Sequence, residues 1–92
     1  MTTLAITYDL NAPGKDYGPL IRRIAALPNA FRYQKSAWLM RGNWSALRVR
    51  DHLLPLIDGN DELMVLEVAD AAWFAAVAKN ASLQLALMPL AA

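Results

Sequence analysis

Two aspartates near the start of the chain are the residues best suited to do chemistry. Asp9 ends an apolar, strand-like run, and Asp16 follows it across a loop of Asn, Pro and Gly. Cleavage of a phosphodiester needs an activated water and neutralised phosphoryl charge, which a divalent metal on carboxylates supplies in many enzymes. One carboxylate binds Mg²⁺ weakly, and two that face each other across a dimer axis bind it better. Asp9 with its symmetry mate is therefore the candidate catalytic residue and Mg²⁺ or Mn²⁺ ligand, unless it is a turn or dimer-interface residue.

Three further residues have both a chemical and a plain interpretation. Asp16 is the next nearest acid, but it also suits hydrogen bonding within its loop or at a helix start. His52, the one histidine of the sequence, could act as a general base or contact a phosphate. An exposed or helix-packed histidine is the competing interpretation, because the only acid close to it in sequence is Asp51. Arg48 fits phosphate binding, although its neighbourhood also suits local ion pairing with Asp51.

Positive charge is concentrated in the middle of the chain. Residues 17–50 hold seven basic side chains and no acid, giving +7, while the rest of the chain sums to −6. Such asymmetry is typical of a surface that binds a polyanion, although scattered arginines also keep an apolar protein in solution. Trp44 lies at the expected start of a helix, where its ring can either stack on a base or pack in a core. The candidate nucleic-acid-binding residues are Arg22, Arg23, Arg32, Arg41, Arg48 and Trp44.

The composition limits what kind of protein this is. The 92 residues form one domain near the lower size limit for a single core, and 57% of them are apolar. A monomer of this size has difficulty hiding so much apolar surface, so we expect a homo-oligomer. The absence of cysteine excludes disulfides, thiolate zinc sites and a cysteine nucleophile. No secretion signal is recognisable and no apolar run reaches the ~20 residues that span a bilayer, so we expect a cytoplasmic protein without a membrane segment.

The first half of the sequence predicts a strand, a helix and a hairpin. Residues 4–8 alternate between the two faces as a strand does. A helix opens at Pro19, which suits a first helical position, and ends at Pro28. Two aromatic-rich runs follow, residues 30–35 and 36–41. They form either a tight hairpin or one long bent strand.

The second half predicts another helix, a turn and a strand. Asn43 or Ser45 can cap the helix, and Pro55 should loosen it because proline lacks an amide donor. Residues 58–61 are a turn by composition. Residues 63–68 are apolar at nearly every position, as a central strand covered on both faces would be.

The resulting order is β-α-β-β-α-β with a C-terminal extension, which predicts an α+β fold of the ferredoxin-like kind. In it an antiparallel four-stranded sheet carries both helices on one face. Residues 1–68 would form the core. Residues 69–92 would form a short helix opening at Asp70 and a dimerisation tail, in which residues 83–88 are either a fifth edge strand or helical. Sheet-to-sheet packing in a two-fold homodimer is the simplest cover for the free face of the sheet.

Three segments of the sequence resemble the SinR-like proteins, a small bacterial and phage group. They are ITYDLNAPGKDY (6–17), SAWLMRGNWSALRVRDHL (36–53) and IDGNDELMVLEV (57–68). The motifs YDL, GKDY, a Trp-containing strand, RDHL and D-x-ND-x-L-x-V occur in the order found in that group. As a set they are fairly specific, and together they cover roughly the first 70 residues.

That group is similar, more distantly, to the CRISPR-associated adaptation protein Cas-two and to the virulence-associated protein D toxins. These are ferredoxin-like dimers, some of them metal-dependent or ribonucleolytic enzymes. Tyr8-Asp9 matches the Tyr-Asp pair that ends the first strand of the Cas-two family, and residues 33–38 are similar to its Gln-x-Ser-aromatic hairpin. The resemblance implies a Cas-two-like, nucleic-acid-associated dimer, with metal-dependent endonuclease action on RNA or DNA as the candidate activity of Asp9. The competing expectation is a non-catalytic dimeric interaction module, or a toxin–antitoxin-like component, that binds a protein partner.

Overall fold

The computed structural model describes residues 2–69 of the chain. The helix expected from Asp70 and the tail over residues 83–88 lie outside these residues. In chain order the elements are β1 (Thr2–Asp9), α1 (Gly18–Ala25), β2 (Phe31–Gln34), β3 (Ala37–Gly42), α2 (Ala46–Leu53), a 3-10 turn (Leu54–Leu56) and β4 (Glu62–Glu67). None of the helices in the described part is long and apolar enough to cross a membrane.

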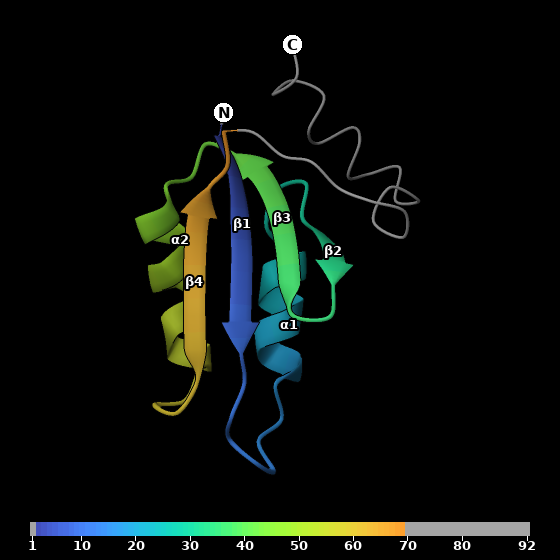
Figure 1. The fold of residues 1–92 in the computed structure, drawn as a ribbon, viewed down its shortest axis with the longest axis vertical. Coiled ribbons are helices and arrows are strands. Elements are labelled where there is room, and N and C mark those ends of the chain that lie inside the picture. The colour runs from blue at the N-terminus through green and yellow to red at the C-terminus, as the bar shows by residue number, and fades with distance from the viewer. Residues whose placement is uncertain (1, 70–92) are drawn as a thin grey trace.

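The four strands form one antiparallel sheet with the order β2-β3-β1-β4. β1 lies in the interior of the sheet, between β3 and β4. Both helices lie against the same face of the sheet (Figure 1). The predicted α+β class is therefore confirmed, and the chain adds a 3-10 turn to the predicted order of elements.

The ends of the helices follow from local chemistry. Asp16 Oδ1 accepts the backbone N–H of Gly18 at 2.8 Å, and Pro19 occupies the first turn of α1. Ser45 rather than Asn43 caps α2, because its Oγ accepts the backbone N–H of Arg48 at 3.1 Å. The helix gives way to the 3-10 turn that contains Pro55, as proline's missing donor requires. Of the two alternatives for residues 30–41, the hairpin is confirmed, since β2 and β3 pair antiparallel.

The core lies between the helices and the sheet. It is formed by alternate residues of β1 and the inward faces of α1 and α2, with α2 lying against β4. Its buried residues are Leu4, Ile6, Tyr8, Leu20, Ile24, Leu27, Trp38, Met40, Val49 and Leu53. Within it Trp38 Nε1 donates to the hydroxyl of Tyr8 at 3.0 Å, so the tyrosine before Asp9 is a satisfied core residue.

The other face of the sheet, which we call the open face, is covered by neither helix (Figure 1). Ala5 and Leu39 are buried there in a smaller apolar cluster. The side chains packed against them are Phe31, Tyr33 and Val68. The aromatic residues of the hairpin are thus divided between the two faces, as the sequence predicts, with Trp38 on the helix side.

The expectation that residues 63–68 form a central strand covered on both faces is wrong. β4 lies at an edge of the described sheet and pairs with β1. Its alternate residues Leu63 and Val65 pack on the core, whereas Met64 and Leu66 are 56% and 49% exposed on the open face. The run is apolar at successive positions because both faces of this edge strand carry apolar side chains, and only one face is covered by helices.

Candidate functional site

Asp9 is the last residue of β1, and its side chain is exposed. Its register partner on β4 is Glu62, so the two carboxylates leave the sheet side by side on the open face. With Thr7 and Met64 they line a shallow depression of about 490 Å³. Neither carboxylate has a hydrogen-bond or ionic partner among residues 2–69. Like charges directly opposite each other repel, so this pair favours a cation.

A metal site needs more ligands than this pair offers. Over the described residues, no group of three or more His, Asp or Glu side chains is close enough together to hold a metal ion. Asp16, the other aspartate of the first loop, takes the helix-start role that the sequence allows for it. Asp9 and Glu62 therefore supply a partial site in one chain, two carboxylates that open towards solvent.

The carboxylate of Asp61 joins the β1–α1 loop to the turn before β4. Its Oδ1 accepts the backbone N–H of Asn11 at 2.7 Å and the hydroxyl of Tyr17 at 2.6 Å. Its Oδ2 accepts the backbone N–H of Asp58 at 2.7 Å. The side-chain amide of Asn11 donates in turn to the carbonyl of Asn60 at 3.2 Å. Both loops are thereby held in one hydrogen-bonded unit.

These hydrogen bonds set the pKa values at this end of the sheet. Desolvation tends to raise the pKa of Asp61, but the hydrogen bonds from Tyr17 and from the amides of Asp58 and Asn11 outweigh it and hold that pKa below its ordinary value. Desolvation and the hydrogen bond to Asp61 raise the pKa of Tyr17 above its ordinary value. Asp61 is therefore an ionised structural acceptor rather than a proton-transfer group at neutral pH.

A second set of polar side chains lies along α2. Arg48 and His52 lie one turn apart on one side of α2, and Trp44 directly precedes its cap residue Ser45. The guanidinium of Arg48 lies over the Trp44 ring, 3.9 Å from its centroid. The His52 ring meets the Trp44 ring edge-on, with the centroids 5.2 Å apart. Arg23 of α1 donates from Nη1 to the carbonyl of His52 at 3.2 Å, which brings a second guanidinium to this side.

Arg22, Arg23 and Arg48 are exposed on the helical layer, and none of them has a carboxylate partner within residues 2–69. Arg50 differs, because its Nη2 forms an ion pair with Asp51 at 2.7 Å, the local pairing that the sequence allows. The interpretation of His52 as an exposed histidine also fits, since its ring packs on Trp44 rather than on an acid.

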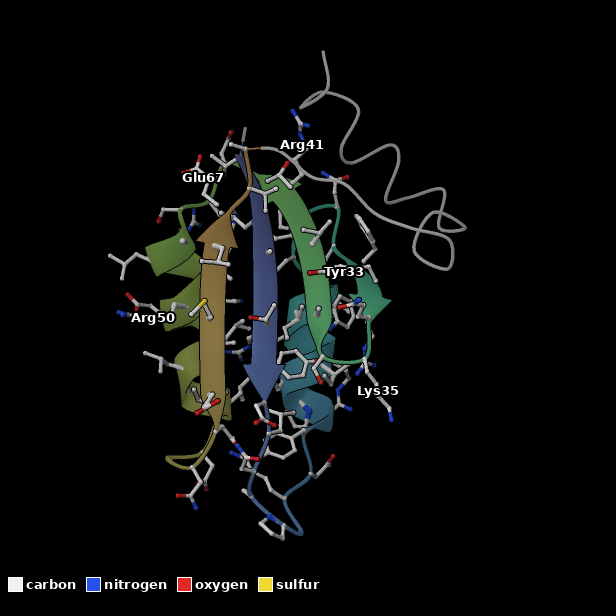
Figure 2. The ribbon with its side chains drawn as sticks, in the orientation of Figure 1. Tyr33, Lys35, Arg41, Arg50 and Glu67 are labelled. Carbon is white, nitrogen blue, oxygen red and sulfur yellow. The ribbon has the colours of Figure 1, made fainter. Side chains whose placement is uncertain are left out.

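The remaining basic residues are distributed over other edges of the molecule. Arg32 donates to the carbonyl of Lys35 across the hairpin turn, with its guanidinium 5.7 Å from the centroid of the Trp38 ring. Figure 2 shows Lys35 at that turn, Arg41 near the far end of β3, and Arg50 on the outer side of α2. The basic residues of positions 17–50 therefore do not form one continuous surface. The most compact group of them lies at α2.

Beside α2 the end of β4 forms a groove of about 350 Å³. It is lined by Thr2, Leu4, Asn43, Trp44, Ser45, Ala46 and Glu67. Glu67 is exposed at the end of β4 (Figure 2), and its carboxylate has no partner among the described residues. The hydroxyl of Thr2 donates to the carbonyl of Trp44 at 2.7 Å, which fixes the start of α2 against β1.

Three carboxylates of these sites are ones that sequence reasoning does not single out. Asp61 belongs by composition to a turn, and only the meeting of two loops in space shows that it binds Tyr17. Glu62 becomes a neighbour of Asp9 through the register of β4 on β1. Glu67 reaches Trp44 only because β4 ends beside α2. The sequence signal for Glu62 and Glu67 is that they stand at the two ends of an apolar strand. This pattern indicates exposed strand ends but assigns no function to them.

Comparison with known proteins finds no matching family model, no matching curated protein and no matching solved structure.

Proposed function

We propose that this protein associates with single-stranded nucleic acid, RNA or DNA, through the exposed side of α2, as a ferredoxin-like homodimer of the SinR-like and Cas-two-like kind. The observation that supports it is the Arg48 guanidinium stacked on Trp44 without a carboxylate partner in the described part of the chain. An aromatic ring beside free guanidinium groups is what sequence-tolerant single-strand binding uses, since the ring stacks on a base and the cation contacts phosphate.

The position of this pair suits a backbone-tracking role. The guanidinium of Arg23, which belongs to α1, reaches the C-terminal end of α2 through its hydrogen bond to the His52 carbonyl. This end of α2 lies about two turns from Trp44. A strand running along α2 would meet Trp44 and Arg48 first and Arg23 after them. Each arginine that neutralises a phosphate releases counterions and strengthens binding at low salt.

The dimer and the fold family are part of the same proposal. The sheet order β2-β3-β1-β4, with both helices on one face, agrees with the ferredoxin-like pattern. Met64 and Leu66 leave the open face apolar at the β4 edge, which favours packing against a second copy. Leu66→Lys should convert the dimer to monomer in analytical ultracentrifugation, while Leu47→Lys, at an exposed leucine on α2, should leave it dimeric.

The binding proposal is tested by fluorescence anisotropy with labelled single-stranded RNA and DNA over a series of salt concentrations. Loss of one phosphate contact in Arg48→Gln should lower the slope of log affinity against log salt by about 0.7. Trp44→Leu should weaken binding about ten-fold through lost stacking. Arg50→Gln is the matched control, because its guanidinium already binds Asp51. Affinity that is independent of salt, or equal losses in Arg48→Gln and Arg50→Gln, would contradict the proposal.

Metal-dependent cleavage at Asp9 is the catalytic extension of this proposal. It is supported by Glu62, which stands opposite Asp9 and gives each chain two carboxylates for Mg²⁺ or Mn²⁺. A sheet-to-sheet dimer would add the same pair from the second copy. Cleavage of labelled RNA and DNA with Mg²⁺, Mn²⁺ or EDTA tests it: activity should need metal and disappear in Asp9→Asn and in Glu62→Gln. Activity that survives both substitutions would remove Asp9 from the reaction.

The second candidate function is a non-catalytic interaction module, in which the open face binds a protein such as the partner in a toxin–antitoxin-like pair. The exposure of Met64 and Leu66 favours it. It predicts no salt-sensitive binding of RNA or DNA, so the anisotropy series separates the two candidates.

A further inference from the structure

The groove between the start of α2 and the end of β4 combines features of a base-binding pocket. Trp44 gives it an aromatic wall, and Asn43, Ser45 and Glu67 give it polar groups from two elements. Its volume of about 350 Å³ is at the lower end of the range for small-molecule sites and suits one planar base. Arg48 lies over the indole, which also packs against the core, so a base would contact the part of the ring that lines the groove.

Two polar groups of the groove are free to bind a ligand, the Glu67 carboxylate and the Ala46 amide. The Glu67 carboxylate has neither a hydrogen bond nor an ion pair among residues 2–69. Ser45 Oγ accepts a hydrogen bond from the backbone N–H of Arg48. The backbone N–H of Ala46, in the first turn of α2, has no intrahelical acceptor. The groove therefore offers a carboxylate acceptor with two oxygens from β4 and a backbone donor from the start of α2.

Among the nucleobases, guanine matches this arrangement best. Its Watson–Crick edge presents N1–H and N2–H side by side, which a carboxylate accepts as a pair, with O6 next to them as an acceptor. Adenine and cytosine offer one amino group on that edge next to acceptor nitrogens that a carboxylate repels. Uracil offers a single N–H between two carbonyls.

We propose that this groove binds a guanine base of the single strand, with Glu67 pairing to its Watson–Crick edge and Trp44 stacking on it. The inference rests on the proposed nucleic-acid function and adds a base preference to it. Arg48, whose guanidinium lies over the same indole, then holds the neighbouring phosphate.

The test uses a labelled oligouridine that carries one central guanosine, compared with the same oligomer carrying inosine, adenosine or cytidine. Inosine lacks only the N2 amino group, so it removes one of the two donors. Wild-type protein should bind the guanosine oligomer about ten-fold more tightly than the inosine oligomer. In Glu67→Gln this preference should disappear while the salt dependence of binding stays unchanged. Asp58→Asn, which neutralises an exposed carboxylate in the turn before β4, is the matched control and should keep the preference.

The outcomes separate this inference from the function on which it rests. Salt-sensitive binding that is equal for guanosine and inosine would overturn the guanine pocket and leave nucleic-acid association standing. A preference that persists in Glu67→Gln would place guanine recognition elsewhere. Absence of binding to every oligomer would overturn both.

Discussion

The two ends of the sheet use their polar side chains in opposite ways. Where β1 ends, Asp61 accepts three hydrogen bonds and Tyr17 both donates and accepts one. Where β4 ends, Arg48 and Glu67 have no oppositely charged partner within residues 2–69. Polar groups that are already satisfied stabilise loops, whereas unsatisfied ones are available to a ligand. At the first end most polar side chains therefore have a structural role, and only Asp9 and Glu62 are available to a ligand. The second end is a candidate binding surface.

The largest difference in stability is expected between substitutions at the adjacent residues Tyr8 and Asp9. Tyr8→Phe should lower the free energy of unfolding by about 1–3 kcal/mol, because the buried Nε1–H of Trp38 loses its acceptor. Asp9→Asn, one residue later, should change it by less than about 0.5 kcal/mol, because that side chain is exposed. Urea denaturation of both variants measures this. A large loss in Asp9→Asn would make Asp9 part of the architecture.

The dependence of stability on acidic pH tests the structural role of Asp61. Because the pKa of Asp61 is lowered in the folded protein, its contribution is complete above the ordinary value of 3.8 and is lost as the pH falls through the folded pKa. Asp61→Asn should therefore lose less stability than wild type on acidification, and Tyr17→Phe, which removes one of the hydrogen bonds that lower this pKa, should also lose less. Thermal unfolding across acidic pH measures both. Identical acid profiles for wild type and Asp61→Asn would show that this carboxylate does not hold the loops.

The smallest effects are expected at the opposite end. Arg48→Gln and Glu67→Gln should each change the free energy of unfolding by no more than about 0.5 kcal/mol, since both side chains are exposed and lack ionic partners in the described residues. Arg50→Gln, which breaks one exposed ion pair, should behave the same way. Urea denaturation is again the measurement. A loss comparable to that of Tyr8→Phe would show that the stack on Trp44 is structural.

The sequence predicts the elements well because their signals are local. Alternation marks β1, Pro19 marks the start of α1, and Pro55 marks the loosening after α2. The error at β4 has a physical cause. A strand that is apolar on both faces has the same pattern whether or not a helix covers each face, and exposure of Leu66 depends on tertiary packing.

The candidate site is harder to predict from the sequence than the fold, because its residues are far apart along the chain. Asp9, Trp44 and Arg48 can be selected by residue type and by position at an element's end. Glu62 and Glu67 acquire their neighbours only through the register of β4 on β1 and its end beside α2. Spacing along the chain also fails to show that the basic residues lie apart in the fold, with Arg41 near the end of β3 (Figure 2) and Arg48 on α2.

The measurement that tests the difference between the two ends most directly is a nitrogen-15 NMR titration of the full chain with a single-stranded RNA. We predict shifts in the Trp44 indole N–H and in the amides of residues 42–48 and 67, with residues 10–17 and 58–61 unmoved. Shifts confined to residues 10–17 and 58–61, or no shifts at all, would contradict the assignment of binding to α2.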